Sequence, residues 1–322
     1  MIIEVRDLRK RFGDVQALAG VDFDLAQGEL FGLLGPNGAG KTTTINLLTG
    51  LTRLDGGAIR VAGIDCTRRP KAAQHLIGVV PDESNLYPEL SGFDNLCFCG
   101  ALYGMPAQER RVRAGELLEI FGLSDAGGRK FAGYSKGMKR KLTIAAGIMQ
   151  RPRILFLDEP TTGIDVASAR RIRQLVADLR RSGTTILLTT HYIEEAERLC
   201  DRIAFLVAGR IVRTDTVANL MQPVQGRHVM QLIVSGSPAA ACGRLESRFP
   251  QMQFHAIDDG RIRAESREPI RAGLLVRFLE EQDIEVSESR LVRPTLEDIF
   301  VQVTGIEAAA MQKEKEGPGG RA

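Results

Sequence analysis

Two short segments of this 322-residue chain combine residue types that handle phosphate and magnesium. The first, Gly35-Pro36-Asn37-Gly38-Ala39-Gly40-Lys41-Thr42, fits the phosphate-loop pattern at every fixed position. Its glycines allow successive backbone N–H groups to point at one anion, and a helix predicted over Lys41–Leu48 adds its positive end. Lys41 can reach the β- and γ-phosphates, and the Thr42 hydroxyl can ligate Mg²⁺. A chance glycine-rich turn is the alternative, which the flanking strand and helix disfavour.

The second segment, Ile154-Leu155-Phe156-Leu157-Asp158-Glu159, is an apolar strand that ends in two carboxylates. Ligands of open parallel sheets bind at the carboxyl ends of the strands. We expect Asp158 to hold a magnesium water and Glu159 to act as the general base that polarises the attacking water. Both could instead be solvated charges, although a complete phosphate loop in the same chain makes that interpretation weaker.

The surrounding sequence alternates segments with strand and helix patterns over about the first 215 residues. Short apolar or β-branched runs at Glu29–Leu34, Arg153–Leu157 and Thr184–Thr189 predict strands. Between the last two, apolar residues from Val166 to Leu179 recur at helical spacing, and Ser182-Gly183 ends that helix. Strands that feed helices in this order predict an α/β fold with a mainly parallel sheet.

The composition changes near Met221–Gly226, where Pro and Gly indicate a linker. We therefore expect a nucleotide-binding domain over residues 1–222, a small α+β domain over 223–305, plausibly a ferredoxin-like sandwich, and a disordered tail over 306–322. The small domain is predicted from a strand, a helix, a hairpin at Asp258-Asp259-Gly260, a helix, a strand and a last helix. Their expected ranges are His228–Val234, Ala239–Phe249, Glu268–Gln282, Ile284–Arg293 and Leu296–Val303.

The composition is that of an ordinary globular protein, with 43% apolar and 26% charged residues. A net charge of +3 does not favour a nucleic-acid partner. Five scattered cysteines indicate reduced thiols and a cytoplasmic protein, and the Cys97-x-Cys99 pair has no second pair at zinc-ligand spacing. The chain shows no signal peptide and no apolar run long enough to span a bilayer, so a membrane role would need a partner.

Taken together, the motifs resemble the nucleotide-binding subunit of ATP-binding-cassette (ABC) transporters over roughly residues 1–220. Tyr134-Ser135-Lys136-Gly137-Met138, before a basic helix, resembles the signature segment of that family, and Gly163-Ile164-Asp165 resembles its D-loop. His191 lies where the family has its switch histidine, and Phe12 where an aromatic residue stacks on adenine. The resemblance implies a phosphate-loop NTPase cassette with a helical subdomain at about residues 84–150.

The resemblance also implies a set of site residues. Glu159, His191 and Lys41 are the expected catalytic residues, and Thr42, Asp158 and Asp82 the expected magnesium ligands. The expected nucleotide contacts are Phe12, Gly35, Pro36, Asn37, Gly38, Ala39, Gly40, Lys41, Thr42, Thr43, Asp82, Ser135, Gly137 and Asp165. Each of these segments also has a purely structural interpretation. Ser135–Gly137 could be a helix cap with a basic face, His191 could be a core histidine, and Phe12 could be a core aromatic residue.

Three positions depart from the family pattern. Lys136-Gly137-Met138 stands where Gly-Gly-Gln is usual, which is tolerable if Lys136 points outward. Asp82 stands where the Q-loop glutamine is expected after the strand Ile77–Val80, and Glu83 is its rival for that position. Ile164 replaces the commoner Leu of the D-loop.

The segment Pro294–Phe300 resembles the closing motif of the drug-, ion- and lipid-exporting subfamily, as does the form of the signature. The resemblance implies an ATPase subunit of an exporter that pairs head-to-tail as a homodimer and attaches to a polytopic membrane permease at the cytoplasmic membrane. Leu86, Tyr87 and Leu90 are candidate permease contacts or ordinary core residues. The alternatives are a soluble ABC-type ATPase acting on ribosome or DNA, and a regulatory nucleotide-binding module.

Overall fold

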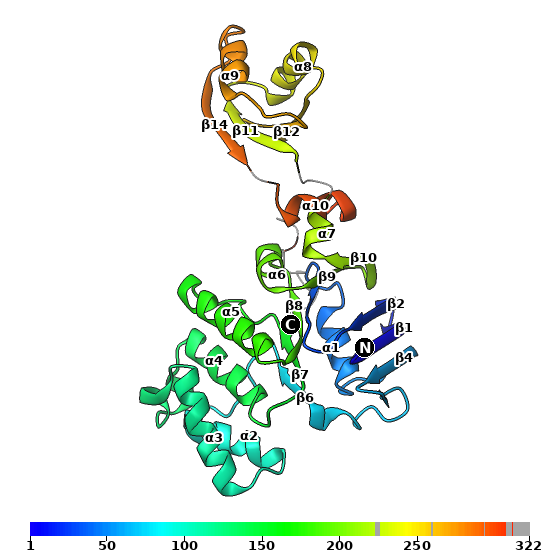
Figure 1. The fold of residues 1–322 in the computed structure, drawn as a ribbon, viewed down its shortest axis with the longest axis vertical. Helices are drawn as coiled ribbons and strands as arrows, with labels where there is room; N and C mark the ends of the chain where they lie inside the picture. The colour runs from blue at the N-terminus through cyan, green and yellow to red at the C-terminus, as the bar shows by residue number, and fades with distance from the viewer. Residues whose placement is uncertain (223–225, 259, 293, 307–310, 312–322) are drawn as a thin grey trace, which may run out of the picture. The chain divides into compact units, whose positions relative to one another are not determined.

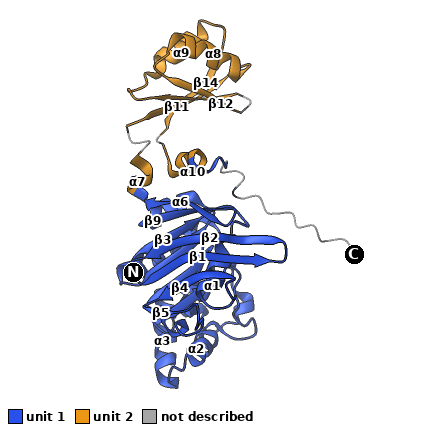
Figure 2. Ribbon diagram, turned by 90° about the vertical axis from the view of Figure 1, so that its right-hand side faces the viewer, with its two compact units in different colours: residues 1–217, 303–322 blue, residues 218–302 orange. Residues whose placement is uncertain are grey.

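The computed structural model describes residues 1–222, 226–258, 260–292, 294–306 and 311. The chain divides into two compact units, coloured separately in Figure 2. The first comprises Met1–Val217 and the residues from Val303 on, and the second comprises Ala218–Gln302. The expected tail over 306–322 falls largely outside the described residues.

A six-stranded sheet forms the centre of the first unit (Figure 1). Its order is β10-β9-β3-β8-β7-β6, and all neighbours from β9 to β6 run parallel. The strands β3, β7 and β8 are fully buried runs of mainly Leu, Ile, Phe and Thr, as expected of a sheet covered on both faces. The strand bounds are Leu30–Leu34 (β3), Ile77–Val80 (β6), Ile154–Asp158 (β7), Thr185–Thr190 (β8), Arg202–Val207 (β9) and Arg210–Thr216 (β10).

Because these strands are parallel, their carboxyl ends meet at one edge of the sheet. The phosphate loop follows β3, Asp82 follows β6, Glu159 follows β7 and His191 follows β8. The mainly parallel α/β fold predicted from the sequence is therefore confirmed. It delivers four separate segments to one place.

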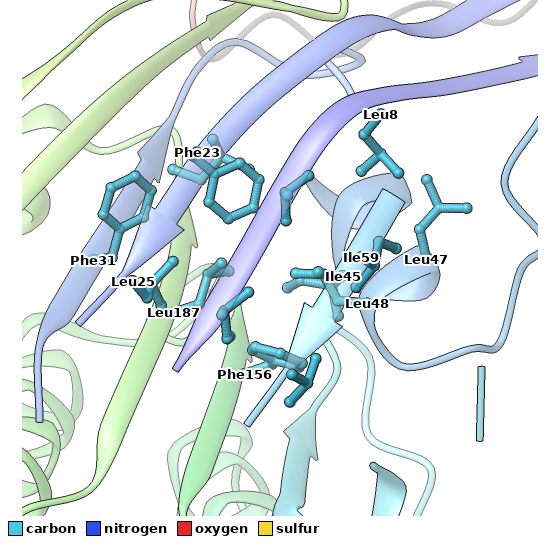
Figure 3. Packing of buried hydrophobic residues seen from close by; sticks show 14 of the residues in the cluster. Leu8, Phe23, Leu25, Phe31, Ile45, Leu47, Leu48, Ile59, Phe156 and Leu187 are labelled. Carbon is cyan, nitrogen blue, oxygen red and sulfur yellow. The ribbon is translucent and has the colours of Figure 1, made fainter. Parts of the chain in front are cut away.

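A second, antiparallel sheet of the first unit was not predicted from the sequence. It has the order β2-β1-β4-β5, with bounds Ile3–Phe12 (β1), Val15–Leu25 (β2), Gly56–Val61 (β4) and Ile64–Asp65 (β5). Its apolar side chains pack with those of β3, β7 and α1 into a single buried core (Figure 3). The rings of Phe23 and Phe31 stack across this core with centroids 5.6 Å apart.

Helices flank the parallel sheet (Figure 1). Their bounds are Lys41–Leu48 (α1), Gly92–Leu102 (α2), Ala107–Ile120 (α3), Lys136–Gly147 (α4), Val166–Arg181 (α5) and Ile193–Leu199 (α6), with short 3₁₀ turns at Gln74–Leu76, Ser124–Ala126 and Phe131–Gly133. A further short helix, α7 (Val217–Met221), belongs to the second unit from Ala218 on. The helices α2, α3 and α4 contact one another and make up the helical region. Helix α4 also packs directly on β6, since a Cβ on Gly78 would lie 2.0 Å from the Gly147 carbonyl oxygen.

The second unit contains a four-stranded antiparallel sheet of order β12-β13-β11-β14 with α8 and α9 packed on it. This β-α-β-β-α-β arrangement is the ferredoxin-like sandwich expected from the sequence. The elements of this unit are His228–Val234 (β11), Pro238–Arg248 (α8), Gln253–Asp258 (β12), Arg261–Ser266 (β13), Ala272–Glu280 (α9), Val286–Val292 (β14) and Leu296–Thr304 (α10). The end of α10, from Val303 on, is assigned to the first unit. Helix α9 begins at Ala272 and not at the predicted Glu268, because Pro269 disfavours helical geometry in the residue before it.

None of the helices within the described residues is long and apolar enough to cross a membrane.

Candidate nucleotide site

The phosphate loop is a cradle that only glycine can build at two of its positions. A Cβ on Gly35 would lie 2.0 Å from the Leu206 carbonyl oxygen, and one on Gly40 would lie 2.7 Å from that of Ala17. Gly40 also has φ +109°, which L side chains rarely adopt. No side chain caps helix α1, which starts directly after Gly40. The first-turn N–H groups of α1 therefore remain available to an anion such as phosphate.

Lys41 lies across the loop that precedes it. Its Nζ donates to the carbonyl oxygens of Gly35 at 2.8 Å and Pro36 at 3.1 Å, and lies 3.1 Å from Glu159 Oε1. The side chain is only 6% exposed. The contact with Glu159 shows that the phosphate loop and the end of β7 converge on one site, although β8 separates β3 from β7 in the sheet.

Glu159 occupies a strained turn at the end of β7. Its φ is +47°, a conformation that costs a residue other than Gly about 1–3 kcal/mol. Thr189 of β8 holds this turn, since the N–H of Glu159 donates to the carbonyl oxygen of Thr189 at 3.1 Å and lies 3.2 Å from its Oγ1. The hydroxyl of Thr162 donates to Glu159 Oε2 at 3.1 Å.

The charge of the Glu159 carboxylate is balanced by two groups. His191 Nδ1 lies 2.9 Å from Glu159 Oε2, without the alignment of a good hydrogen bond, and Lys41 approaches the other oxygen. Burial alone would raise the pKa of Glu159, but His191 and Lys41 outweigh it and lower that pKa below its ordinary value. The carboxylate is therefore ionised at neutral pH, as a general base must be.

Asp158 and Asp82 bring further negative charge to the same edge. Asp158 is 3% exposed and accepts a hydrogen bond from the Thr189 hydroxyl. Partial burial raises the pKa of Asp82, Arg140 opposes that shift, and the carboxylates of Asp158, Glu159 and Glu83 add to it. Carboxylates such as these, and the hydroxyl of Thr42 directly after the phosphate-loop lysine, are oxygen donors of the kind that suits Mg²⁺.

The segment Ser135–Gly137 begins helix α4. Ser135 Oγ accepts from the Met138 N–H at 3.2 Å, which leaves its own O–H as a donor. Lys136 is exposed and points away from the fold. This is the orientation that we expected for a lysine at a position where the family usually has glycine. Gly137 is buried against helix α5, since a Cβ there would lie 2.4 Å from Ser168 Oγ.

Asp165 and Phe12, the other two expected nucleotide contacts, do not contact the Lys41–Glu159 cluster within the described residues. Asp165 caps α5 by accepting from the Ser168 N–H at 2.9 Å. It therefore belongs to the same junction of α4 and α5 as Gly137. Phe12 ends β1 with 50% of its surface exposed, and Lys10 Nζ lies 5.1 Å from its ring centroid. An exposed aromatic ring can stack on a planar base.

Three residues that support this edge were not singled out from the sequence. Thr189 links β8 to the end of β7, since its hydroxyl donates to the Asp158 carboxylate and its Oγ1 lies 3.2 Å from the backbone N–H of Glu159. Glu195 of α6, which is 2% exposed, accepts from the Thr161 hydroxyl at 2.8 Å, and burial raises its pKa. Arg140 lies in the run Lys139-Arg140-Lys141, which reads as a solvated basic face, yet its side chain is 7% exposed. The sequence carried no signal that separates Arg140 from its neighbours.

The fold and the site together define a phosphate-loop ATPase of the cassette class. Residues 18–162 match the family described as ABC transporter. The chain is 37% identical to the daunorubicin resistance ATP-binding protein DrrA2 of Streptomyces coeruleorubidus, an alignment that covers 94% of this chain and 95% of that protein. It is 38% identical to the Nod factor export ATP-binding protein I of Burkholderia lata, with 95% of this chain and 97% of that protein covered. This chain belongs to the ABC transporter family, which confirms the resemblance drawn from its motifs.

Solved structures agree with this assignment. The ATP-binding subunit of an ABC transporter superposes with a TM-score of 0.63 at 31% identity, covering 69% of this chain and 93% of that one. A dimeric ATP-binding cassette in a post-hydrolysis state, bound to ADP and Pi, superposes with a TM-score of 0.62 at 26% identity and covers 67% of this chain and 98% of that one. The predicted fold class, an ATP-binding cassette, is confirmed.

A first prediction concerns the α4–α5 junction. Gly137→Ala should destabilise the protein by about 1–3 kcal/mol, the usual cost of overpacking, because the added methyl meets Ser168. Thermal unfolding measures the effect. Gly133→Ala, where a Cβ meets nothing within 4 Å, is the matched control. Ser168→Gly in the Gly137→Ala background should restore the unfolding midpoint, and a double variant no more stable than Gly137→Ala would contradict the clash.

A second prediction concerns pH. Because the pKa of Glu159 is lowered in the folded state, its contribution to stability is present above the ordinary carboxyl pKa of about 4.3. That contribution is lost as pH falls through the lower, folded-state pKa. The nucleotide-free protein should therefore lose thermal stability relative to Glu159→Gln as pH falls from about 5 to about 3. A pH-independent difference between the two unfolding midpoints would show that Glu159 is not held in its charged form.

Proposed function

We propose that this chain is the ATP-hydrolysing subunit of a membrane exporter and that the residues around Lys41 and Glu159 perform the hydrolysis. The observation that carries the proposal is the 3.1 Å contact between the phosphate-loop lysine and the carboxylate at the end of β7. This contact supports the proposal because Lys41, Glu159 and His191, whose Nδ1 lies 2.9 Å from the same carboxylate, form one buried cluster.

In this proposal, ATP takes over the contacts that Lys41 makes in the free protein. Its phosphates accept hydrogen bonds from backbone N–H groups of the phosphate loop and of the first turn of α1. They also accept from the ammonium of Lys41, which then leaves the carbonyls of Gly35 and Pro36. The Glu159 carboxylate, released from Lys41, accepts a proton from the attacking water. His191, at the end of the neighbouring strand, donates a hydrogen bond to the γ-phosphate. Phe12 stacks on the adenine.

Thr42, Asp158 and Asp82 would hold Mg²⁺. Bound there, Mg²⁺ neutralises charge on the β- and γ-phosphate oxygens. The carboxylates at this edge support the assignment. Desolvation is the main cause that raises the pKa of Asp82, and the neighbouring carboxylates raise it further; a divalent cation would offset that negative charge.

Two copies of the chain are proposed to pair head-to-tail. Each ATP would then lie between the phosphate loop of one chain and Ser135–Gly137 of the other, with Asp165 beside the interface. The exposed positions of Ser135, Lys136 and Val166, the last 82% exposed, support a contact surface there. A related cassette bound to ADP and Pi is dimeric.

The permease partner would dock on the helical region at the cytoplasmic face of the membrane. Tyr87 and Phe98, 50% and 38% exposed, pack edge-to-face with centroids 5.0 Å apart, and Leu102 is 71% exposed. Leu86 is buried and therefore belongs to the core in this structure. The direction of transport is inferred from relatives that are named for drug resistance and Nod factor export.

A third prediction tests the base. Glu159→Gln should bind ATP but lower kcat by about 10²–10⁴-fold, because the amide cannot accept the proton of the attacking water. Phosphate release at saturating ATP measures kcat, and Glu89→Gln, an exposed carboxylate outside the site, is the control. Equal turnover by the Glu159→Gln variant and the wild type would show that Glu159 is not the general base.

A fourth prediction tests the phosphate contact. Lys41→Ala should weaken ATP binding by at least about tenfold, since the charge-assisted hydrogen bonds of the ammonium are lost. Isothermal titration calorimetry measures the affinity, with the exposed Lys71→Ala as the control. An unchanged dissociation constant would contradict the proposed binding mode.

A further inference from the structure

Arg140 joins three segments of the nucleotide site through one buried side chain. Its Nε donates to the Pro160 carbonyl oxygen at 2.9 Å, and its Nη2 donates to that of Asp158 at 2.5 Å. Its Nη1 donates to the carbonyl oxygens of Pro81 and of Asp82, the latter at 2.9 Å. One guanidinium on helix α4 thus contacts the ends of both β6 and β7.

Only arginine suits this position among the cationic residues. Its planar guanidinium carries five N–H donors and stays protonated in proteins, whereas a lysine ammonium has three donors on one atom and cannot span four carbonyl groups. Burial lowers the pKa of Arg140, and the negative charges of Asp82, Asp158, Glu195 and Glu159 partly offset that effect. The Arg140 side chain is therefore a fixed structural link between α4 and the ends of β6 and β7.

The segments that Arg140 joins serve different parts of the proposed reaction. The end of β6 carries Asp82, and the turn after β7 carries Asp158 and Glu159. Helix α4 begins five residues before Arg140, at Ser135, which caps it. One turn further along α4, the Thr143 hydroxyl donates to Ser84 Oγ at 2.8 Å, so the Asp82 segment contacts α4 at two levels.

We infer that Arg140 is a positioning residue that couples the nucleotide site of its own chain to Ser135–Gly137, the segment that contacts the partner's nucleotide in the proposed dimer. The inference rests on the proposed function. Movement of the Asp82 and Asp158 backbones on nucleotide binding is passed to α4 through the hydrogen bonds of Arg140. Without them, each chain still binds ATP at its phosphate loop, but α4 no longer takes the position that closes the dimer.

The test measures ATP-driven dimerisation of the full chain in the Glu159→Gln background, where hydrolysis does not consume the nucleotide. Arg140→Met keeps the length and packing of the side chain without its donors, and Arg140→Lys keeps the charge. Lys139→Met, the neighbouring cation on α4 whose Nζ lies 5.6 Å from the Phe131 ring centroid, is the control. Sedimentation velocity with MgATP gives the dimer dissociation constant, and calorimetry gives the ATP affinity of the monomer.

We expect the ATP dissociation constant of both Arg140 variants to lie within about threefold of that of the Glu159→Gln parent. Their dimer dissociation constant should be at least about tenfold higher, which is the effect of one lost charge-assisted hydrogen bond. The Lys139→Met control should dimerise like the parent. Parent-like dimerisation of either Arg140 variant would overturn the inference. Loss of ATP binding together with dimerisation in both variants would also overturn it, because it would indicate general structural damage. A parent protein that stays monomeric with MgATP would instead count against the proposed dimer itself.

Discussion

The site depends on bringing a lysine from the phosphate loop against a carboxylate that lies two strands away in the sheet. Lys41 and Glu159 are 6% and 7% exposed, so their attraction acts with little screening by water. Burying either charge alone would be costly, and the pair is stable because Lys41 also donates to two carbonyls while Glu159 lies beside His191. The close-packed core beneath the sheet keeps these strand ends in register.

In the nucleotide-free protein, Lys41 and Glu159 already have partners for their charges. The ammonium that the phosphates would recruit is occupied by carbonyl oxygens and by the candidate base. A triphosphate offers more negative charge than either partner, so binding exchanges one set of ionic contacts for another. In the proposed function, the same exchange would free the Glu159 carboxylate when a phosphate is present to be attacked.

Much of this arrangement could be predicted from the sequence. The phosphate loop and the strand that ends at Asp158–Glu159 are each one continuous segment, so their residue types and spacing can be recognised directly. The central strands and α1 were predicted to within a residue or two, because their short apolar or β-branched runs are bounded by Pro, Gly or acidic residues. The antiparallel sheet was missed, since β1 and β2 mix polar and apolar residues along irregular registers. Arg140 and Glu195 were missed for another reason. Their burial depends on which helix covers which strand end, and a charged residue on a helix gives no local sign of that.

The left-handed backbone of Glu159 has a consequence for how this protein can be altered. Glycine would adopt that conformation without penalty and would relax the turn after β7. Losing the acidic side chain would, however, leave the buried Lys41 ammonium without its carboxylate partner, which costs more than the relaxed turn gains. In the proposed function, the chemistry needs a carboxylate at this left-handed position. Efforts to stabilise this protein should therefore leave that turn unchanged and target the exposed loops instead.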